Sequence, residues 1–85
     1  MTRDEVMADL QEIFRSQFDD EDIVLSDGTT AADIEDWDSL AHMELIARVE
    51  AHSGIHFSLG QINNFANVGE MRDCIVDLMS AKGGR

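Results

Sequence analysis

Apolar residues recur at helical spacing over most of this 85-residue chain, and no segment alternates convincingly at the period of a β-strand. The chain contains no proline, so only glycine, capping residues or a loss of the apolar pattern can interrupt a helix. This combination predicts an all-α fold. We expect a small four-helix bundle in which three main helices and one short helix share a single core.

Capping residues set the boundaries of the expected helices. Thr2 and Glu5 have the spacing of a capping box, and Gly54 has the position of a helix C-cap. The short helix has a second box in Ser58 and Gln61, and Asn67 caps the last helix with Glu70 in its first turn. We therefore expect helices over about 3–18, 38–53 and 58–65, and a final one from Asn67 onwards.

A long connection separates the first two helices. It opens with four adjacent carboxylates, residues 19–22, which oppose the dipole at a helix C-terminus and repel one another. Connections of about 20 residues are uncommon in small domains and are usually functional or disordered. Four apolar residues are spread along this one, and we expect them to anchor it to the core in an ordered form: Ile23, Leu25, Ile34 and Trp37.

Size and charge restrict the classes of function. A chain of 85 residues makes one domain, expected to be ordered over about 3–80 with a flexible tail at 82–85. Its net charge of −12 would repel nucleic acids and anionic membranes, and it favours partners with basic docking patches. One cysteine, no apolar run long enough for a membrane span and no signal-peptide pattern predict a soluble, cytoplasmic monomer.

The second helix carries two apolar stripes. One stripe suits the core and consists of Leu45, Ile46 and Val49. The other begins one residue after Ser39 and consists of Leu40, Met43 and Ala47. A domain this small cannot easily bury a helix on every side, so the second stripe is a candidate surface for another molecule.

Ser39, at the start of this helix, has two possible uses. Its hydroxyl can cap the helix by accepting a hydrogen bond from a free backbone N–H, the commoner role of serine at such a position. Alternatively, it can carry a phosphate, because free N–H groups and the positive end of the helix dipole favour an anion there. The triplet Asp38-Ser39-Leu40 alone favours capping.

The surrounding sequence, however, resembles the prosthetic-group site of acyl carrier proteins. The similarity is densest over residues 36–45, which read DWDSLAHMEL, and it covers most of residues 34–78. It continues through Ile46, Val49, Glu50, Gly54, Ile55, Phe65 and Val68. The length of the connection, the order of the helices and the acidic balance agree with this family.

The resemblance implies a carrier that catalyses nothing itself. Ser39 would be esterified by 4′-phosphopantetheine from coenzyme A, and the thiol of that arm would hold acyl groups as thioesters. Asp38 would help a phosphopantetheinyl transferase to place its metal-bound coenzyme A beside the serine. The recognition face for this transferase and for acyl-loading and acyl-processing enzymes would consist of Leu40, Met43, Glu44 and Ala47. Such carriers serve fatty-acid, polyketide or related biosynthesis.

Each of these roles has a plainer alternative. Leu40 and Met43 can close the core against the long connection. Glu44 and Arg48 have the spacing of an i,i+4 ion pair. The acidic run 19–22 fits a solvated helix end better than a docking site.

The chain also departs from the common family pattern. Trp37 stands where many carriers have a small residue, and its ring can pack the connection onto the second helix or shape access to Ser39. Ser53 stands where the family often has a large apolar residue, and Ala41 and His42 follow the motif directly. The second helix has fewer acids than many fatty-acid carriers. These departures favour a specialised, freestanding carrier.

The sequence is also compatible with other functions. Within the family, the chain can be an aminoacyl or peptidyl carrier of nonribosomal assembly. Outside it, the chain can be an acidic helical interaction module that binds a partner helix through its second stripe. A small hydrolase ranks last, because Ser39 and His42 lie only one helical turn apart and no oxyanion elbow is visible.

No metal site is expected. A structural zinc site needs four converging ligands, and the candidates are three histidines at 42, 52 and 56 together with Cys74. Gly54 interrupts the helix that would align the second and third histidines. We expect surface histidines and a partly buried, inert Cys74 thiol.

Overall fold

Helix α1 (Arg3–Phe18) begins with the expected capping box. The Glu5 N–H donates to Thr2 Oγ1 at 3.1 Å, and the Thr2 N–H donates to Glu5 Oε1 at 2.8 Å. The helix ends at Asp19, which adopts a left-handed backbone conformation with φ 50°. These details come from a computed structural model that describes residues 2–63 and 65–83, with side chains as far as residue 81.

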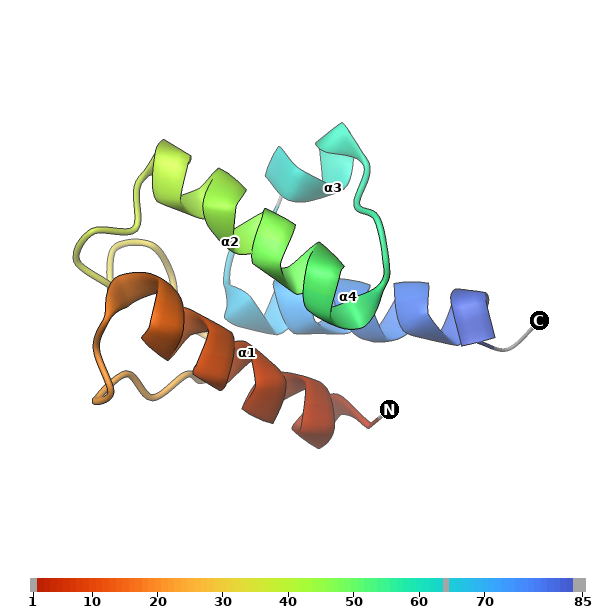
Figure 1. Cartoon of the computed structure of the whole chain (residues 1–85), viewed down its shortest axis with the longest axis horizontal. Coiled ribbons are helices and arrows are strands. Elements are labelled where there is room, and N and C mark those ends of the chain that lie inside the picture. The colour runs from red at the N-terminus through yellow and green to blue at the C-terminus, as the bar shows by residue number, and fades with distance from the viewer. Residues whose placement is uncertain (1, 64, 84–85) are drawn as a thin grey trace.

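Three further helices follow: α2 (Ser39–Ser53), α3 (Leu59–Asn63) and α4 (Val68–Gly83). Residues 2–63 and 65–83 contain no strand, so the all-α prediction is confirmed. Figure 1 shows α1 starting and α4 ending at one end of the molecule, with the long connection between α1 and α2 at the other. None of the described helices is long and apolar enough to cross a membrane.

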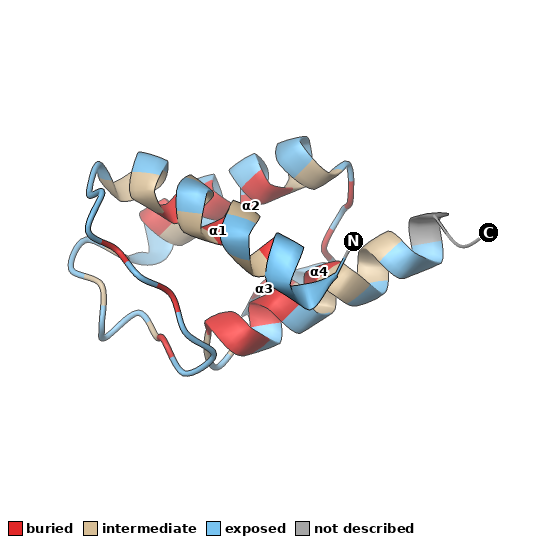
Figure 2. Cartoon of the chain, turned by 90° about the horizontal axis from the view of Figure 1, so that it is seen from below, coloured by how far each residue is buried: buried red, intermediate tan, exposed pale blue. Residues whose placement is uncertain are grey.

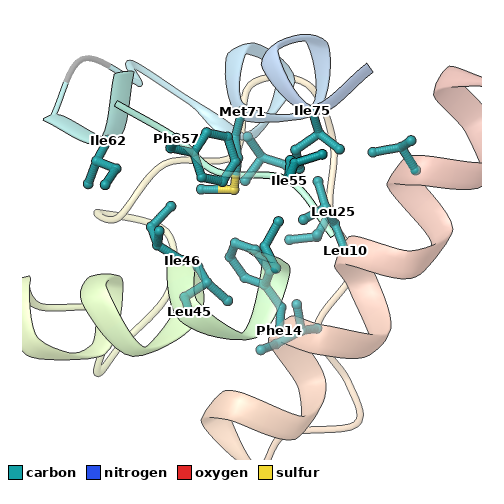
Figure 3. Packing of buried hydrophobic residues seen from close by; sticks show 14 residues of the cluster. Leu10, Phe14, Leu25, Leu45, Ile46, Ile55, Phe57, Ile62, Met71 and Ile75 are labelled. Carbon is teal, nitrogen blue, oxygen red and sulfur yellow. The ribbon is translucent and has the colours of Figure 1, made fainter. Parts of the chain in front are cut away.

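The core lies between the helices, and every helix contributes to it. Buried residues occur on each of them and are seen most clearly on α2 and α4 in Figure 2, and side chains from distant parts of the sequence meet in the core (Figure 3). The stripe of Leu45, Ile46 and Val49 is buried, as the sequence predicted. The other buried members are Val6, Leu10, Phe14, Ile23, Leu25, Ile55, Phe57, Ile62, Val68, Met71 and Ile75.

The predicted helix ends need two corrections. Ser58 and Gln61 do form a capping box, but α3 ends at Asn63 and does not reach Phe65. Phe65 packs edge-on against Phe57 instead, with ring centroids 5.6 Å apart. In addition, α4 extends to Gly83, so the first part of the expected flexible tail is helical; residues 84–85 lie outside the described residues.

The start of α4 is capped as predicted. The Glu70 N–H donates to Asn67 Oδ1 at 2.9 Å, while Glu70 Oε1 accepts from the Ala66 N–H at 3.0 Å. The carboxylate thus reaches one residue further back than in an ordinary capping box. Both contacts hold the chain between α3 and α4 to the helix start.

The long connection is anchored to α1 in its first half. Ile23 and Leu25 are buried, and their backbone groups are bonded by side chains of α1. Arg15 Nε donates to the Ile23 carbonyl at 2.8 Å, and the Leu25 N–H donates to Gln11 Oε1 at 3.1 Å. Further along, Ile34 and Trp37 are half-buried against the core. All four expected anchors are therefore confirmed.

The middle of the connection is anchored to α4. Arg72 is only 6% exposed and donates from both Nη atoms to the Asp27 carboxylate. This guanidinium lowers the pKa of Asp27. Nearby, the Gly69 N–H donates to the Asp27 carbonyl at 2.9 Å, and the Val68 N–H donates to the Thr29 carbonyl at 2.8 Å. The first turn of α4 thus uses its free N–H groups to hold the connection.

Gly69 permits this close approach, and its replacement is our first prediction. A Cβ at position 69 would lie 2.8 Å from the Asp27 carbonyl oxygen, a backbone atom that cannot swing away. Gly69→Ala should therefore lower the free energy of unfolding by about 1–3 kcal/mol, although alanine is the better helix former. The matched control is Gly60→Ala in α3, where a Cβ meets no atom of the described residues closer than 4.0 Å.

Urea denaturation of both variants provides the measurement. The control should be neutral or more stable than wild type by up to about 1 kcal/mol, from helix propensity alone. Equal effects of the two substitutions would show that the connection does not depend on its contact with α4.

Candidate functional site

Asp38 is the N-cap of α2. Its backbone is extended, with φ −107° and ψ −172°, and its Oδ1 accepts a hydrogen bond from the Ala41 N–H at 2.8 Å. Its carbonyl accepts the first helical hydrogen bond, from the His42 N–H, also at 2.8 Å. One residue therefore supplies both the side-chain and the backbone acceptor that start this helix.

Ser39 is the first residue of the helix and does not cap it. Its side chain is exposed, and its hydroxyl makes no hydrogen bond to any residue within 2–63 and 65–83. The capping interpretation of this serine is therefore wrong. The N–H groups of Ser39 and Leu40 also have no acceptor in the same part of the chain, so unpaired donors lie beside the hydroxyl.

A groove of about 610 Å³ runs past Ser39. This volume is within the usual range for small-molecule sites. The groove lies between the connection, the start of α2, α3 and the segment after α3. It is lined by Thr30, Ala31, Ala32, Trp37, Asp38, Ser39, His42, Met43, Ile62, Asn63, Phe65, Ala66 and Asn67.

Trp37 both packs the connection and lines this groove. Its ring meets Phe14 of α1 edge-on, with centroids 5.1 Å apart and planes at 87°. It also stacks on His42 of α2, with centroids 5.9 Å apart and planes at 29°. The packing interpretation is therefore confirmed. The ring also lines the groove beside Ser39, and its influence on access to that serine stays a prediction.

The three histidines are separated and serve different contacts. His42 is half-buried and bonded to Trp37 and Ile62, which corrects the prediction of a surface residue. His52 and His56 are exposed and lie beside Asp9 and Glu50 respectively. No group of three or more potential ligands that could hold a metal occurs among the described residues.

Cys74 is half-buried in α4, as predicted. Burial raises the pKa of its thiol, and the negative charge of Asp77 adds to the effect. A thiol that stays protonated is a poor nucleophile and a poor metal ligand. Cys74 is therefore a packing residue.

The second stripe of α2 faces solvent. Leu40 is 71% exposed and Met43 50%, and Ala47 is also exposed, so the alternative in which the first two close the core is wrong. Glu44 accepts a hydrogen bond from Gln17 at 2.8 Å and Arg48 donates to Ser16 at 3.2 Å, in place of the expected ion pair with each other. Leu40, Met43, Glu44 and Ala47 thus belong to an accessible surface of α2.

Two exposed apolar residues were not singled out from the sequence. Leu59, in α3, is as exposed as Val24 in the long connection. Leu59 could have been noticed as an apolar residue at the start of a short polar helix. Val24 offers no such signal, since it stands between two buried residues in an apolar run.

Comparison with known proteins identifies the family. No family model and no curated protein matches the chain. A solution NMR structure of a holo acyl carrier protein from Geobacter metallireducens, however, superposes on it with a TM-score of 0.88. The two sequences are 41% identical, and the match covers 94% of this chain and 92% of that one.

The helical fold places the chain in the class of small carrier domains. At this level of identity and coverage, the chain belongs to the acyl carrier protein family. It is a carrier of acyl groups and not an enzyme.

The assignment of the cap to Asp38 makes a second prediction. Asp38→Ala should lower the free energy of unfolding by about 1 kcal/mol, because it removes the acceptor for the Ala41 N–H. Ser39→Ala should change it by less than about 0.5 kcal/mol. Chemical denaturation at constant ionic strength measures both effects.

Glu35→Ala is the matched control for charge. It removes a carboxylate from the same connection, and Glu35 has no hydrogen bond or ion pair with the described residues. If Ser39→Ala lowered the free energy of unfolding as much as Asp38→Ala does, Ser39 would have to be the capping residue, and the assignment of the cap to Asp38 would be wrong.

Proposed function

We propose that Ser39 is the attachment residue for a 4′-phosphopantetheine arm. The observation that supports this most directly is the unengaged, exposed hydroxyl at the first position of α2, next to an aspartate that already caps the helix. The relative from Geobacter metallireducens is described as a holo protein, in agreement with a prosthetic group in this family. The arm would be joined through a phosphodiester, and its terminal thiol would hold the acyl group as a thioester.

The residues around Ser39 fit such a group. The unpaired N–H groups of Ser39 and Leu40 lie at the positive end of α2, where a phosphate is stabilised. The adjoining groove offers apolar walls from Trp37, Ile62 and Phe65. The hydroxyl, the anion-binding helix end and the groove are thus contiguous.

Asp38 can serve the loading step without giving up the cap. Only its Oδ1 is bonded to the Ala41 N–H, and its Oδ2 has no partner among the described residues. We propose that this second oxygen faces the metal-bound coenzyme A of the phosphopantetheinyl transferase. In that step the Ser39 oxygen would bond to the phosphorus that bears the pantetheine, and the phosphoanhydride bond of coenzyme A would break. Adenosine 3′,5′-bisphosphate would leave with the electrons of that bond, and a base of the transferase would take the serine proton.

Partner enzymes would bind the surface formed by Leu40, Met43, Glu44 and Ala47. Thirteen of the eighteen acidic residues lie within the first 38 positions, together with only two arginines. Three exposed acids, Glu35, Asp36 and Asp38, immediately precede Ser39. A partner with an apolar patch for α2 and a basic patch for this connection would be steered to the arm.

The proposal extends to the location of the protein, its oligomeric state and the group that it carries. We propose a cytoplasmic monomer that serves fatty-acid, polyketide or related biosynthesis. The alternative cargo is an aminoacyl or peptidyl group. Transfer from acyl and aminoacyl donors to the loaded protein separates these two, since each loading enzyme is specific for its donor class.

Loading of Ser39 is the third prediction. Incubation with coenzyme A, Mg²⁺ and a promiscuous phosphopantetheinyl transferase should add one phosphopantetheinyl group to the wild type and none to Ser39→Ala. Intact-mass spectrometry measures the product. An unmodified wild type, or an equal gain by Ser39→Ala, would contradict the proposal and leave an acidic interaction module.

The recognition face gives the fourth prediction. Met43→Glu should retain the fold, because Met43 is half exposed, but should slow transfer of the arm to Ser39 by about tenfold or more, because it places a charge in an apolar interface. The matched control is Val24→Glu, the same kind of change at an exposed residue outside this face. Equal rates of arm transfer to Met43→Glu and Val24→Glu would show that Met43 does not contact the transferase.

A further inference from the structure

His42 uses both nitrogens of its ring. The indole N–H of Trp37 donates to His42 Nδ1 at 3.2 Å, and His42 Nε2 lies 3.0 Å from the carbonyl oxygen of Ile62. A carbonyl can only accept a hydrogen bond and an indole N–H can only donate one, so the proton must be on Nε2. The contacts therefore specify one neutral tautomer of the ring.

This ring joins three walls of the groove beside Ser39. Trp37 belongs to the long connection, His42 to α2 and Ile62 to α3, and all three residues line the groove. We refer to the contacts Trp37–His42–Ile62 as the histidine bridge. The bridge passes about one helical turn from Ser39, on the helix that starts with it.

Helix α3 depends on contacts of this kind. It has five residues, fewer than an isolated helix needs to be stable, and only Ile62 among them is buried. The Ile62 carbonyl lies in the last turn, where carbonyl groups have no partner within the helix. His42 of α2 supplies a donor to this carbonyl and so ties the last turn of α3 to α2.

We propose that His42 is a positioning residue: the histidine bridge sets the shape of the groove, and an acyl group carried on Ser39 depends on it for its place against Trp37 and α3. This inference rests on the proposed attachment at Ser39. The plainer alternative is a histidine that only satisfies its own hydrogen bonds. The two differ in what happens when cargo is loaded.

The first measurement uses the unmodified protein. The chain has a single tryptophan, so one indole N–H signal in the ¹⁵N NMR spectrum reports the bridge. His42→Leu keeps a side chain of similar size but removes donor and acceptor, whereas His42→Gln retains both. The leucine variant should shift the indole signal toward that of free indole. It should also speed amide exchange in α3 on the order of tenfold, and glutamine should restore both properties.

The second measurement uses the same proteins loaded from hexanoyl-coenzyme A. Loading should shift the Trp37 indole signal in the wild type and in His42→Gln, because the tryptophan lines the groove. That shift should be lost in His42→Leu, while its melting temperature stays unchanged between unloaded and loaded forms. Hydroxylamine should cleave the thioester of the leucine variant faster than that of the wild type.

The outcomes are separable. An unchanged indole signal and unchanged α3 exchange in unmodified His42→Leu would show that the bridge holds nothing, and would overturn the proposal. A broken bridge with an intact loading shift would leave His42 a merely structural residue, and would overturn it as well. If the wild type cannot be loaded, the proposed function fails, and the unmodified-protein data identify that failure as distinct from failure of the bridge.

Trp37→Phe provides a second variant if His42→Leu does not fold. It removes only the indole donor and keeps an aromatic ring against Phe14. Its readout is the amide signals of residues 59–63, which should lose their response to hexanoyl loading. A response equal to that of the wild type would overturn the bridge as a determinant of the groove.

Discussion

The hydrogen bond from the Ala41 N–H to Asp38 Oδ1 is the interaction on which the site depends. It satisfies one of the free donors at the start of α2 without involving the next residue. Ser39 therefore enters the helix with its hydroxyl exposed and unengaged. If the serine itself capped the helix, its use as an attachment point would compete with the stability of α2. Under the proposed attachment at Ser39, the two tasks fall on adjacent residues instead.

The rest of the molecule holds this helix start in place while leaving one side of it open. Trp37 packs against Phe14 of α1. The side chains of Arg15 and Gln11 bond the first half of the connection, and Arg72 bonds its middle to α4. Helix α3, by contrast, is short and buries only one residue. The long connection is thus anchored by several contacts, whereas α3, on another side of the groove, is held by few. Local stability of this kind is expected where a small domain must accommodate and release a ligand.

Much of the fold could be predicted from the sequence, because its determinants are local. The apolar spacing and capping residues gave three of the four helices almost to the residue, and Gly54 marked the end of α2 correctly. The predicted end of α3 was wrong: the helix stops at Asn63, and Phe65 lies outside it in contact with Phe57, a residue that helical spacing does not reveal as its partner. Glu44 and Arg48 likewise find partners on α1 that their own helix does not reveal.

The site was less accessible to sequence reasoning alone. Asp38 and Ser39 are both good N-caps, and preference scales cannot say which of two neighbours takes the role. The structure resolves this in favour of Asp38. His42 was expected at the surface. The sequence could not show its partial burial, because its partner in α3 is the backbone carbonyl of a residue twenty positions away, and any residue type can supply a carbonyl. The proposed role of Ser39 rests on family resemblance and not on its position alone.

The division of tasks between Asp38 and Ser39 can be measured at one amide. Hydrogen exchange of the Ala41 N–H, followed by NMR before and after attachment of the arm, reports whether the aspartate keeps the cap. We predict the same protection in both states, since the phosphodiester would bond to the N–H groups of Ser39 and Leu40 and leave Ala41 with Asp38. Loss of protection at Ala41 after attachment would show that capping and attachment compete for one position, and would contradict the account.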